Sequence, residues 1–347
     1  MKKILLVKTS ALGDILQTFS VVEYIKAKIP SSQIDWVVEK DYVDLLLSYS
    51  QVDRVISFDS HRFRKNGIQY FSEIRSFFRF LRQTDYDYVF DLQGNCKSGL
   101  ITLFSKGRKK IGYDFRSVPE WPNWLTTSTH IRVPIKRNMR EQYLFLVQQG
   151  LGKKEDLSFL TKEISLVSQE PFPIVFPKNR YKILICPHSR WKSKEMSPKI
   201  LSDLVSLFSQ NSSPIFYWVW GSEEERAYVQ TLASSSHSEV LPKISLPLLQ
   251  RVMKEMDLII SVDSSLLHLA GLTSTPLLAV FGPSQSSLFA PLGKQCVSIQ
   301  GRCSHKKTFP KRCPHLRSCQ TRNCMDRSAE EIFSLWKTKI SSASSFD

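Results

Sequence analysis

Three short segments of the chain combine acids, cations, hydroxyls and glycine at spacings that suit chemistry on an anionic substrate. They are KTSALGD at 8–14, CPHSRWKSK at 186–194 and SVDSSLLH at 261–268. Each follows an apolar run and precedes an amphipathic pattern, which predicts a turn from a strand into a helix. Because ligands of parallel sheets bind beyond the carboxyl ends of the strands, all three turns are candidate sites.

The first segment ends in a glycine and a carboxylate. Gly13 permits close approach of the backbone to a ligand. Asp14 has two interpretations, which the spacing alone leaves open. It is either an acid that stabilises the start of a helix or a general base that faces a cleft.

The other two segments suit phosphate groups. Arg190, Lys192 and Lys194 lie within five residues of each other, and they form either a diphosphate site or a solvated basic loop. Ser264 and Ser265 either cap a helix or leave its N–H groups to an anion. Four residues after Ser264, His268 is either a packed polar residue or part of the same site.

The elements that must position these turns alternate as strands and helices, which predicts two α/β domains. The proline-rich segment 169–178 suits an extended linker and marks the expected boundary. Strands are expected at 3–8, 34–38, 54–58, 88–91, 183–186, 215–219, 258–262 and 276–281. Helices are expected in the amphipathic stretch that follows Asp14 and runs to Lys28, and at 41–48, 68–83, 97–105, 198–209, 223–233, 246–254, 266–272 and 328–340.

Composition narrows the class of protein. The 347 residues carry 48 Lys and Arg against 32 Asp and Glu, a net charge of +16 that favours anionic partners. No apolar run reaches the ~18 residues of a transmembrane helix, and the run at 4–7 is too short for a signal peptide. Seven cysteines form an odd set, which indicates reduced thiols in a cytosol.

Seven stretches, in order along the chain, resemble the ADP-heptose:lipopolysaccharide heptosyltransferases, and the heptosyltransferase I branch most. They are KTSALGDILQTF (8–19), IDWVVE (34–39), HRFRK (61–65), DLQGNCKS (91–98), WGSEEERA (220–227), EVLPKISL (239–246) and SVDSSLLHLAGLTSTPLLAVFGPS (261–284).

The resemblance implies a GT-B fold, with two Rossmann-like domains facing across a cleft. Residues 1–170 would bind the acceptor, 178–327 the nucleotide sugar, and the helix in 328–347 would cross back to the first domain. The implied activity is inverting transfer of a heptose from ADP-heptose to a Kdo residue of the lipopolysaccharide inner core. It implies no cofactor or metal, and a peripheral position at the cytoplasmic face of the inner membrane.

Residue roles follow from the same resemblance. Asp14 would be the base and Lys194 would neutralise the leaving ADP. The donor would bind to Ser189, Lys194, Glu223, Ile244, Asp263, Ser264, Ser265 and His268. The acceptor would bind to Lys8, Gly13, Arg62, Arg64, Lys65, Gln93 and Lys97.

Two features depart from the resembled branch. Pro119, in GYDFRSVPE, stands where that branch has an arginine, and the nearest arginine is Arg116. The segment 302–327 is longer, basic and rich in cysteine.

The sequence also leaves open two alternative classes of protein. A metal or nucleic-acid-binding module would use Cys303, Cys313, Cys319 and Cys324, although no C-x-x-C pair is present. A sugar-nucleotide epimerase would share the architecture but would not need a basic acceptor patch.

Overall fold

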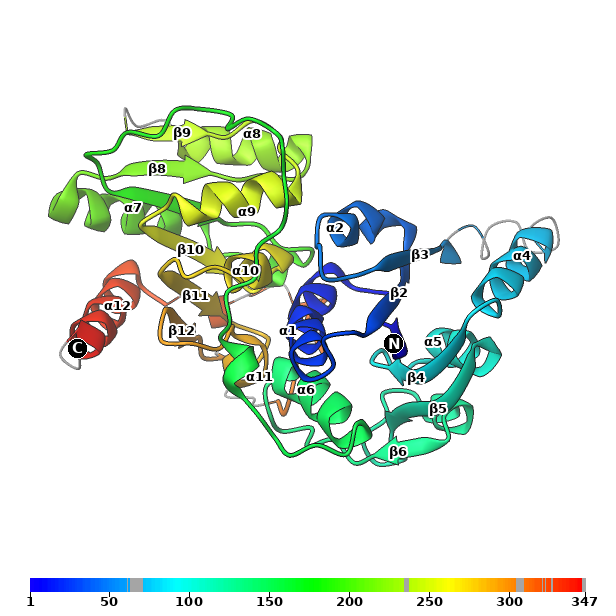
Figure 1. Ribbon diagram of the computed structural model, residues 1–347. Helices are drawn as coiled ribbons and strands as arrows, with labels where there is room; N and C mark the ends of the chain where they lie inside the picture. Colours follow the sequence, from blue (N-terminus) through cyan, green and yellow to red (C-terminus); the bar gives the residue numbers. More distant parts are fainter. Residues whose placement is uncertain are drawn as a thin grey trace. The chain divides into compact units, whose positions relative to one another are not determined.

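The computed structural model describes residues 1–344 apart from 61, 63–70, 234–236, 304–308, 320, 322 and 326. It divides the chain into two compact units, Met1–Lys162 and Glu163–Asp347 (Figure 1). The division falls before the proline-rich segment because residues 164–170 already bond to the second unit. Ile164 N donates to Leu272 O at 2.9 Å, and Leu166 N donates to Gln250 Oε1 at 2.7 Å.

The first unit is built on a 6-stranded sheet of order β3-β2-β1-β4-β5-β6, in which every neighbouring pair is parallel. The strands are β1 (Lys3–Val7), β2 (Gln33–Glu39), β3 (Arg54–Phe58), β4 (Asp85–Asp91), β5 (Lys106–Tyr113) and β6 (Thr129–Ile131). The central strand β1 is buried almost throughout, as expected for a parallel strand covered by helices on both faces.

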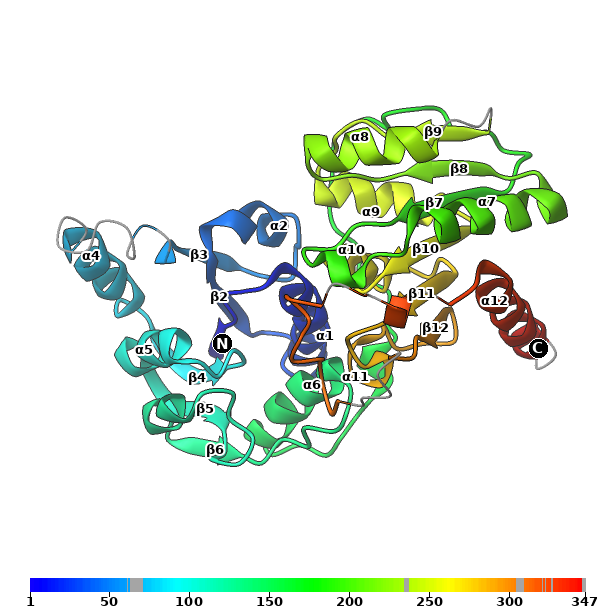
Figure 2. The same cartoon turned by 180° about the vertical axis from the view of Figure 1, so that it is seen from behind.

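Helices cover both faces of this sheet. The α-helices are α1 (Leu12–Lys28), α2 (Val43–Leu47), α4 (Phe71–Leu81), α5 (Cys96–Phe104) and α6 (Met139–Gly150), with 3₁₀ turns η1 (Lys40–Tyr42), η3 (Trp121–Thr126) and η4 (Ser158–Leu160). Leu81 of α4 and Ile101 of α5 pack with Leu5 and Val7 in one core, whereas α1 packs with α6. Figure 1 shows α1 and α6, and Figure 2 shows α4 and α5 from behind.

The second unit repeats the topology, with strand order β12-β11-β10-β7-β8-β9 and parallel pairs throughout. Its strands are β7 (Lys182–Cys186), β8 (Ile215–Trp218), β9 (Ser238–Val240), β10 (Leu258–Val262), β11 (Leu277–Phe281) and β12 (Cys296–Gln300). Its helices are α7 (Pro198–Ser212), α8 (Glu223–Leu232), α9 (Leu246–Lys254), α10 (Ser265–Ala270), α11 (Ser286–Phe289) and α12 (Ala329–Ser344), with 3₁₀ turns η5 (Lys192–Lys194) and η6 (Asn323–Met325).

The last helix, α12, belongs to the second unit. Ile332, Phe333 and Trp336 are buried in the same core as α7, and the rings of Phe333 and Phe208 meet edge to face at 4.8 Å. The apolar stripe of this helix is thus buried within the second unit. The expected crossing of 328–347 to the first domain stays a prediction.

The expected strands and helices agree with the structure to within a few residues, apart from those that fall on 68–70, outside the described residues. No periodic pattern predicted β5, which reads KGRKKIGY, or the short strands β6 and β9. It also missed β12 and α6, whose apolar positions are interrupted by polar residues. None of the helices described here is long and apolar enough to cross a bilayer.

Candidate active site

Both sheets reverse their winding at one point, between β1 and β4 in the first unit and between β7 and β10 in the second. The crevice beyond the carboxyl ends of such strands is where doubly wound folds bind ligands. The segment 8–14 follows β1, the segment 186–194 follows β7, and the segment 261–268 follows β10. Each candidate turn therefore lies at the reversal point of its own sheet.

In the second unit, the centre of the site is a buried ion pair. Lys194 Nζ lies 2.6 Å from Asp263 Oδ2, and their side chains are 9% and 6% exposed. Ser189 Oγ donates to the backbone oxygen of Asp263 at 2.9 Å, so the loops after β7 and β10 are joined twice. The sequence predicted all three residues, and the structure brings them together.

The pair determines the charge state of Asp263. Burial raises the pKa of the Asp263 carboxyl group. The adjacent Lys194 ammonium and His268 lower this pKa by more than burial raises it, so the pKa of Asp263 falls below its usual value. Asp263 is therefore a carboxylate at neutral pH. An ammonium has three donors, and Asp263 occupies one of them.

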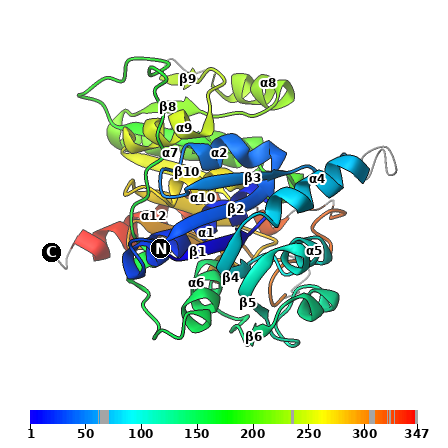
Figure 3. The same ribbon diagram turned by 45° about the vertical axis from the view of Figure 1, so that its right-hand side comes forward.

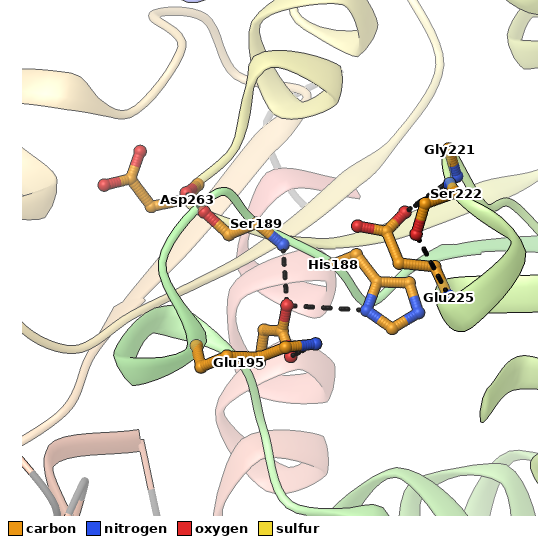
Figure 4. Close-up of polar contacts among 8 residues, drawn as sticks. His188, Ser189, Glu195, Gly221, Ser222, Glu225 and Asp263 are labelled. Atoms are coloured by element: carbon orange, nitrogen blue, oxygen red, sulfur yellow. Dashed lines mark hydrogen bonds and ion pairs between the residues drawn. The ribbon is translucent and has the colours of Figure 1, made fainter. Parts of the chain in front are cut away.

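Glu195 stabilises the loop after β7 through contacts with three of its residues (Figure 4). Its Oε1 accepts from Ser189 N at 3.1 Å and lies 3.4 Å from His188 Nδ1, and its Oε2 lies 3.2 Å from Lys192 Nζ. Burial raises the pKa of Glu195. The hydrogen bonds from His188 and from the Ser189 backbone lower this pKa by more, so the net shift is downward. The carboxylate thus fixes the loop that carries Ser189 and Lys194.

The turn after β10 leads into a helix of six residues. Ser264 is its N-cap residue but makes no side-chain cap bond, and its buried Oγ has no hydrogen-bond partner among the described residues. Ser265 is the first residue of α10, and His268 is 5% exposed and close enough to Asp263 to lower its pKa. The Ser264 hydroxyl is thus a donor that no capping bond uses.

The three glutamates at the start of α8 are distinguished by their contacts. Ser222 and Glu225 form a capping box, in which Glu225 N donates to Ser222 Oγ at 3.2 Å and Ser222 N donates to Glu225 Oε2 at 3.3 Å (Figure 4). Gly221 N also donates to Glu225 Oε2, at 2.7 Å. Glu223 is exposed and pairs with Arg226 at 3.3 Å. The cap therefore uses Glu225 and leaves Glu223 accessible. Ile244 is partly exposed in the loop after β9.

The cysteine segment packs against the donor loop. Ser193 Oγ donates to Leu316 O at 2.5 Å, and the Arg317 guanidinium lies 4.7 Å from the centre of the Trp191 ring. Cys313 N donates to Pro283 O at 2.7 Å, which ties the same segment to the loop after β11. The segment that the resemblance explains least therefore supports η5, the turn that carries Lys194.

The segment contains four thiols, those of Cys303, Cys313, Cys319 and Cys324. Burial raises the pKa of Cys324 to about 11, with smaller contributions from Cys319, Cys303 and Cys313. Within the described part of the chain, no group of three or more His, Cys, Asp or Glu is arranged to hold a metal ion.

In the first unit, Asp14 lies in the first turn of α1 and is partly exposed. Its carboxylate accepts no hydrogen bond and forms no ion pair with the described residues. The pKa of Tyr113 is raised, chiefly by burial and also by Asp91 and Asp14, so these acids lie near the Tyr113 ring. Gly13 precedes Asp14 in the same turn. Among the predicted site residues of the first unit, Asp14 therefore has a side chain that no described residue holds in place.

Two predicted acceptor residues hold the loops after β1 and β4 in place. Lys8 is only 2% exposed, and its Nζ donates to Tyr143 Oη at 2.9 Å. Gln93 Oε1 accepts from Ser10 N at 3.2 Å. For Lys8 in particular, this burial favours a supporting role over direct contact with an acceptor.

Pro119 packs on the loop after β4. A Cβ on Gly94, which has φ +73°, would lie 2.5 Å from Pro119 Cδ, so this contact requires glycine. The neighbouring Glu120 N donates to Gly94 O at 3.1 Å. The proline therefore fills space beside Gln93, and Arg116 is exposed to solvent.

Of the remaining acceptor candidates, Lys97 lies near the end of β2. Lys97 Nζ bonds to Glu39, and to Ser60 Oγ at 3.1 Å, so its charge is balanced within the unit. Arg62 is exposed and lies 3.7 Å from Glu73. Arg64 and Lys65 lie outside the described residues.

The chain is similar to known proteins over most of its length. The profile of glycosyltransferase family 9 (heptosyltransferase) matches residues 74–318. The chain belongs to glycosyltransferase family 9. The protein is thus an enzyme of sugar transfer. Membership of this family argues against the two alternative classes, the epimerase and the nucleic-acid-binding module.

Relatives of this family 9 glycosyltransferase span nearly its whole length. Lipopolysaccharide heptosyltransferase 1 of Escherichia coli (strain K12) is 28% identical, over 84% of this chain and 91% of the relative. The protein of the same name from Pseudomonas aeruginosa is 26% identical, over 95% and 92%. The structure of E. coli heptosyltransferase WaaC with ADP superposes with a TM-score of 0.79 at 23% identity, covering 97% of this chain and 99% of that one. These matches confirm the resemblance and the GT-B class of fold.

Sequence reasoning missed three supporting residues of this glycosyltransferase: Glu195, Glu39 and Tyr143. Glu195 lies one residue after Lys194, and Glu39 ends a matched strand segment, so both were visible as acids next to predicted sites. Tyr143 lies far along the chain in α6, and only the fold brings it to Lys8.

We predict that Lys194 and Asp263 are strongly coupled. Lys194→Met and Asp263→Asn should each lower the free energy of unfolding by about 3–5 kcal/mol at neutral pH, because each leaves a buried charge unpaired. The double variant should lose less than the sum. Urea unfolding of the four proteins measures this, and additive single effects would contradict the coupling.

The contribution of Asp263 to the stability of the fold should decrease in acid. The folded pKa of Asp263 is lowered, so its contribution is fully present above about pH 4, the unfolded value, and is lost as pH falls through the folded pKa. The stability difference between wild type and Asp263→Asn should therefore shrink in acid.

Proposed function

We propose that this chain transfers a heptose from ADP-heptose to a Kdo residue of the lipopolysaccharide inner core, with inversion at the anomeric carbon. The observation that carries the proposal is the buried Lys194–Asp263 pair at the β7/β10 reversal point, beside the unused hydroxyl of Ser264. This arrangement suits a diphosphate, because it offers, in a place of low solvation, an ammonium whose other donors no described residue occupies.

The reaction is a single displacement. Asp14 accepts the proton of the acceptor hydroxyl while its oxygen attacks the anomeric carbon, and the bond from that carbon to the β-phosphate oxygen breaks. Negative charge then develops on ADP, where Lys194 stabilises it. The transition state resembles an oxocarbenium ion, so one base and one cation at the leaving group are the minimal equipment.

The other donor contacts follow from position. Ser189, Ser264, Ser265 and His268 surround Asp263 and would orient the diphosphate, while the exposed Glu223 would bind the ribose hydroxyls. Ile244 would offer an apolar contact to the nucleoside. The relative whose title names ADP supports a nucleotide donor of this kind.

The acceptor is proposed from charge and from relatives. Kdo carries a carboxylate, and the family resemblance assigns its recognition to a set of cations and polar groups: Arg62, Arg64, Lys65 and Lys97, with Gln93 and Gly13. Relatives named lipopolysaccharide heptosyltransferase 1 support an acceptor of the lipopolysaccharide core. Because this acceptor is anchored by lipid A, we place the enzyme at the cytoplasmic face of the inner membrane.

A direct assay tests the proposal. The purified protein is incubated with ADP-heptose and Kdo-lipid A, and the lipid product is weighed by mass spectrometry. We expect a mass increase of one heptosyl residue. An unchanged lipid, with transfer to a different core acceptor instead, would assign the chain to another branch of the family.

The base is tested by Asp14→Asn. Loss of a general base lowers the rate by about 10² to 10⁴, whereas donor affinity should be retained because Asp14 does not contact the diphosphate. Steady-state rates and ADP titration calorimetry separate the two effects. Activity within a few-fold of wild type would remove Asp14 from this role.

The donor site is tested by Lys194→Ala, with the exposed Lys199→Ala as the matched control. A lost charge-assisted hydrogen bond is worth roughly 1.5–3 kcal/mol, so the affinity for ADP should fall at least about tenfold. Lys199→Ala should bind as wild type does. An unchanged ADP affinity in a folded Lys194→Ala protein would place the donor elsewhere.

We further propose that transfer needs no metal or cofactor. Elemental analysis should find no stoichiometric metal, and a chelator should leave activity and melting temperature unchanged. About one zinc or iron per chain, lost together with stability, would instead make the four thiols at 303, 313, 319 and 324 the ligands.

A further inference from the structure

Large apolar side chains are exposed on two neighbouring helical segments of the first unit. Leu100 and Leu103 of α5 are 52% and 46% exposed, and Phe104 is 43% exposed. Trp121 and Leu125 of η3 are 61% and 63% exposed. Exposed apolar residues are ordinary when they are scattered, but a group of them on adjacent elements marks an interaction surface.

Contacts on either side of α5 show that these residues adjoin. A Cβ on Gly99 would lie 3.1 Å from Asn123 Nδ2 and from Thr126, so this side of α5 faces η3. On the other side, the Phe104 ring lies 4.8 Å from the Phe78 ring of α4. At 100° per residue, Leu103 and Leu100 point between these two contacts. The exposed face of α5 is therefore continuous from η3 to α4, and Figures 2 and 3 both show α4 beside α5.

The α4 border of this face is cationic. Arg75, Arg79 and Arg82 flank Phe78 and are exposed, and none has a carboxylate partner among the described residues. Lys110 Nζ donates to Leu103 O at 2.7 Å, at the end of α5. Burial lowers the pKa of Lys110, and Arg82 lowers it further, so positive charges lie close together here. An anionic partner would relieve this repulsion.

The combination of exposed Trp, Leu and Phe with arginines that have no carboxylate partner among the described residues is the chemistry of binding at a lipid–water interface. The apolar side chains enter the acyl boundary, and each cation adds to the attraction of anionic headgroups. A soluble acidic protein would satisfy the cations but would not require so many exposed apolar residues. The observations therefore favour a bilayer.

We propose that the surface formed by Leu100, Leu103, Phe104, Trp121 and Leu125, bordered by Arg75, Arg79 and Arg82, docks onto an anionic lipid bilayer. The inference rests on the proposed function, in which the acceptor is anchored in a membrane. Lys97, the predicted acceptor residue in the first turn of α5, is on the same helix as Leu100. Docking through this face brings the acceptor loops to the headgroup layer.

Vesicle flotation tests the surface directly. The full chain is mixed with vesicles of phosphatidylcholine alone, or of phosphatidylcholine with phosphatidylglycerol, at low and high salt. We expect flotation with the anionic vesicles, reduced by salt, and little with the neutral ones. Absence of flotation with both would overturn the proposal and would leave a protein partner as the occupant.

Two paired variants separate the apolar and cationic parts. Leu103→Ser/Trp121→Ser should reduce partitioning at all salt concentrations. Arg75→Glu/Arg79→Glu should reduce it at low salt by at least about fivefold per cation. Val167→Ser/Val175→Ser, at apolar positions that are 59% and 96% exposed, and Lys153→Glu/Lys154→Glu are the controls. If both test pairs float as the controls do, the surface is not the docking site.

A second readout keeps this test independent of the proposed reaction. Transfer to a soluble Kdo fragment without acyl chains should be unchanged in both test pairs, whereas transfer to Kdo-lipid A in anionic vesicles should fall. Equal loss on both acceptors would show a folding or active-site defect and would overturn the docking role. Failure of the wild type to transfer heptose at all, with flotation intact, would contradict the proposed function but not the surface.

Discussion

Parallel pairing of β1 with β4 and of β7 with β10 is the constraint on which both units depend. Each pairing joins two halves of a sheet that wind in opposite directions, so the loops beyond these strands diverge and leave room for a ligand. The loops at these points carry Asp14 and Gln93 in one unit and Lys194 and Asp263 in the other. Helices cover both faces of each sheet, so the carboxyl edges are where function can be placed.

Charges at these edges are held by internal partners. Lys194 is paired with Asp263, Lys97 with Glu39, and the Lys8 ammonium with Tyr143. Such pairs offset the cost of removing charge from water, and they fix side chains that a substrate would otherwise have to order. Asp14 differs, because its carboxylate has no hydrogen-bond or ion-pair partner among the described residues. This contrast fits a base that must exchange a proton, set among groups that only bind and orient.

The two features that depart from the resembled branch make packing contacts next to the predicted site residues. The cysteine segment supports the donor loop through Ser193 and Trp191, and Pro119 packs on Gly94 beside Gln93. The chain's excess of positive charge serves two purposes in the proposed picture. Some cations line the substrate sites, and others border the exposed face of α5, where a lipid-anchored acceptor would be met.

The sequence by itself determined the alternation of strands and helices, the family and the three turns, because apolar periodicity and local motifs act between near neighbours along the chain. It could not find β5, because Lys106, Arg108 and Lys109 are exposed and give the strand no apolar alternation. Nor could it find the place of α12, whose apolar stripe fits any complementary core. The pairing of Lys194 with Asp263 and of Lys8 with Tyr143 joins residues far apart in the chain. Only the tertiary structure decided these contacts, since burial and the register of parallel strands are set by the whole sheet and not by local sequence.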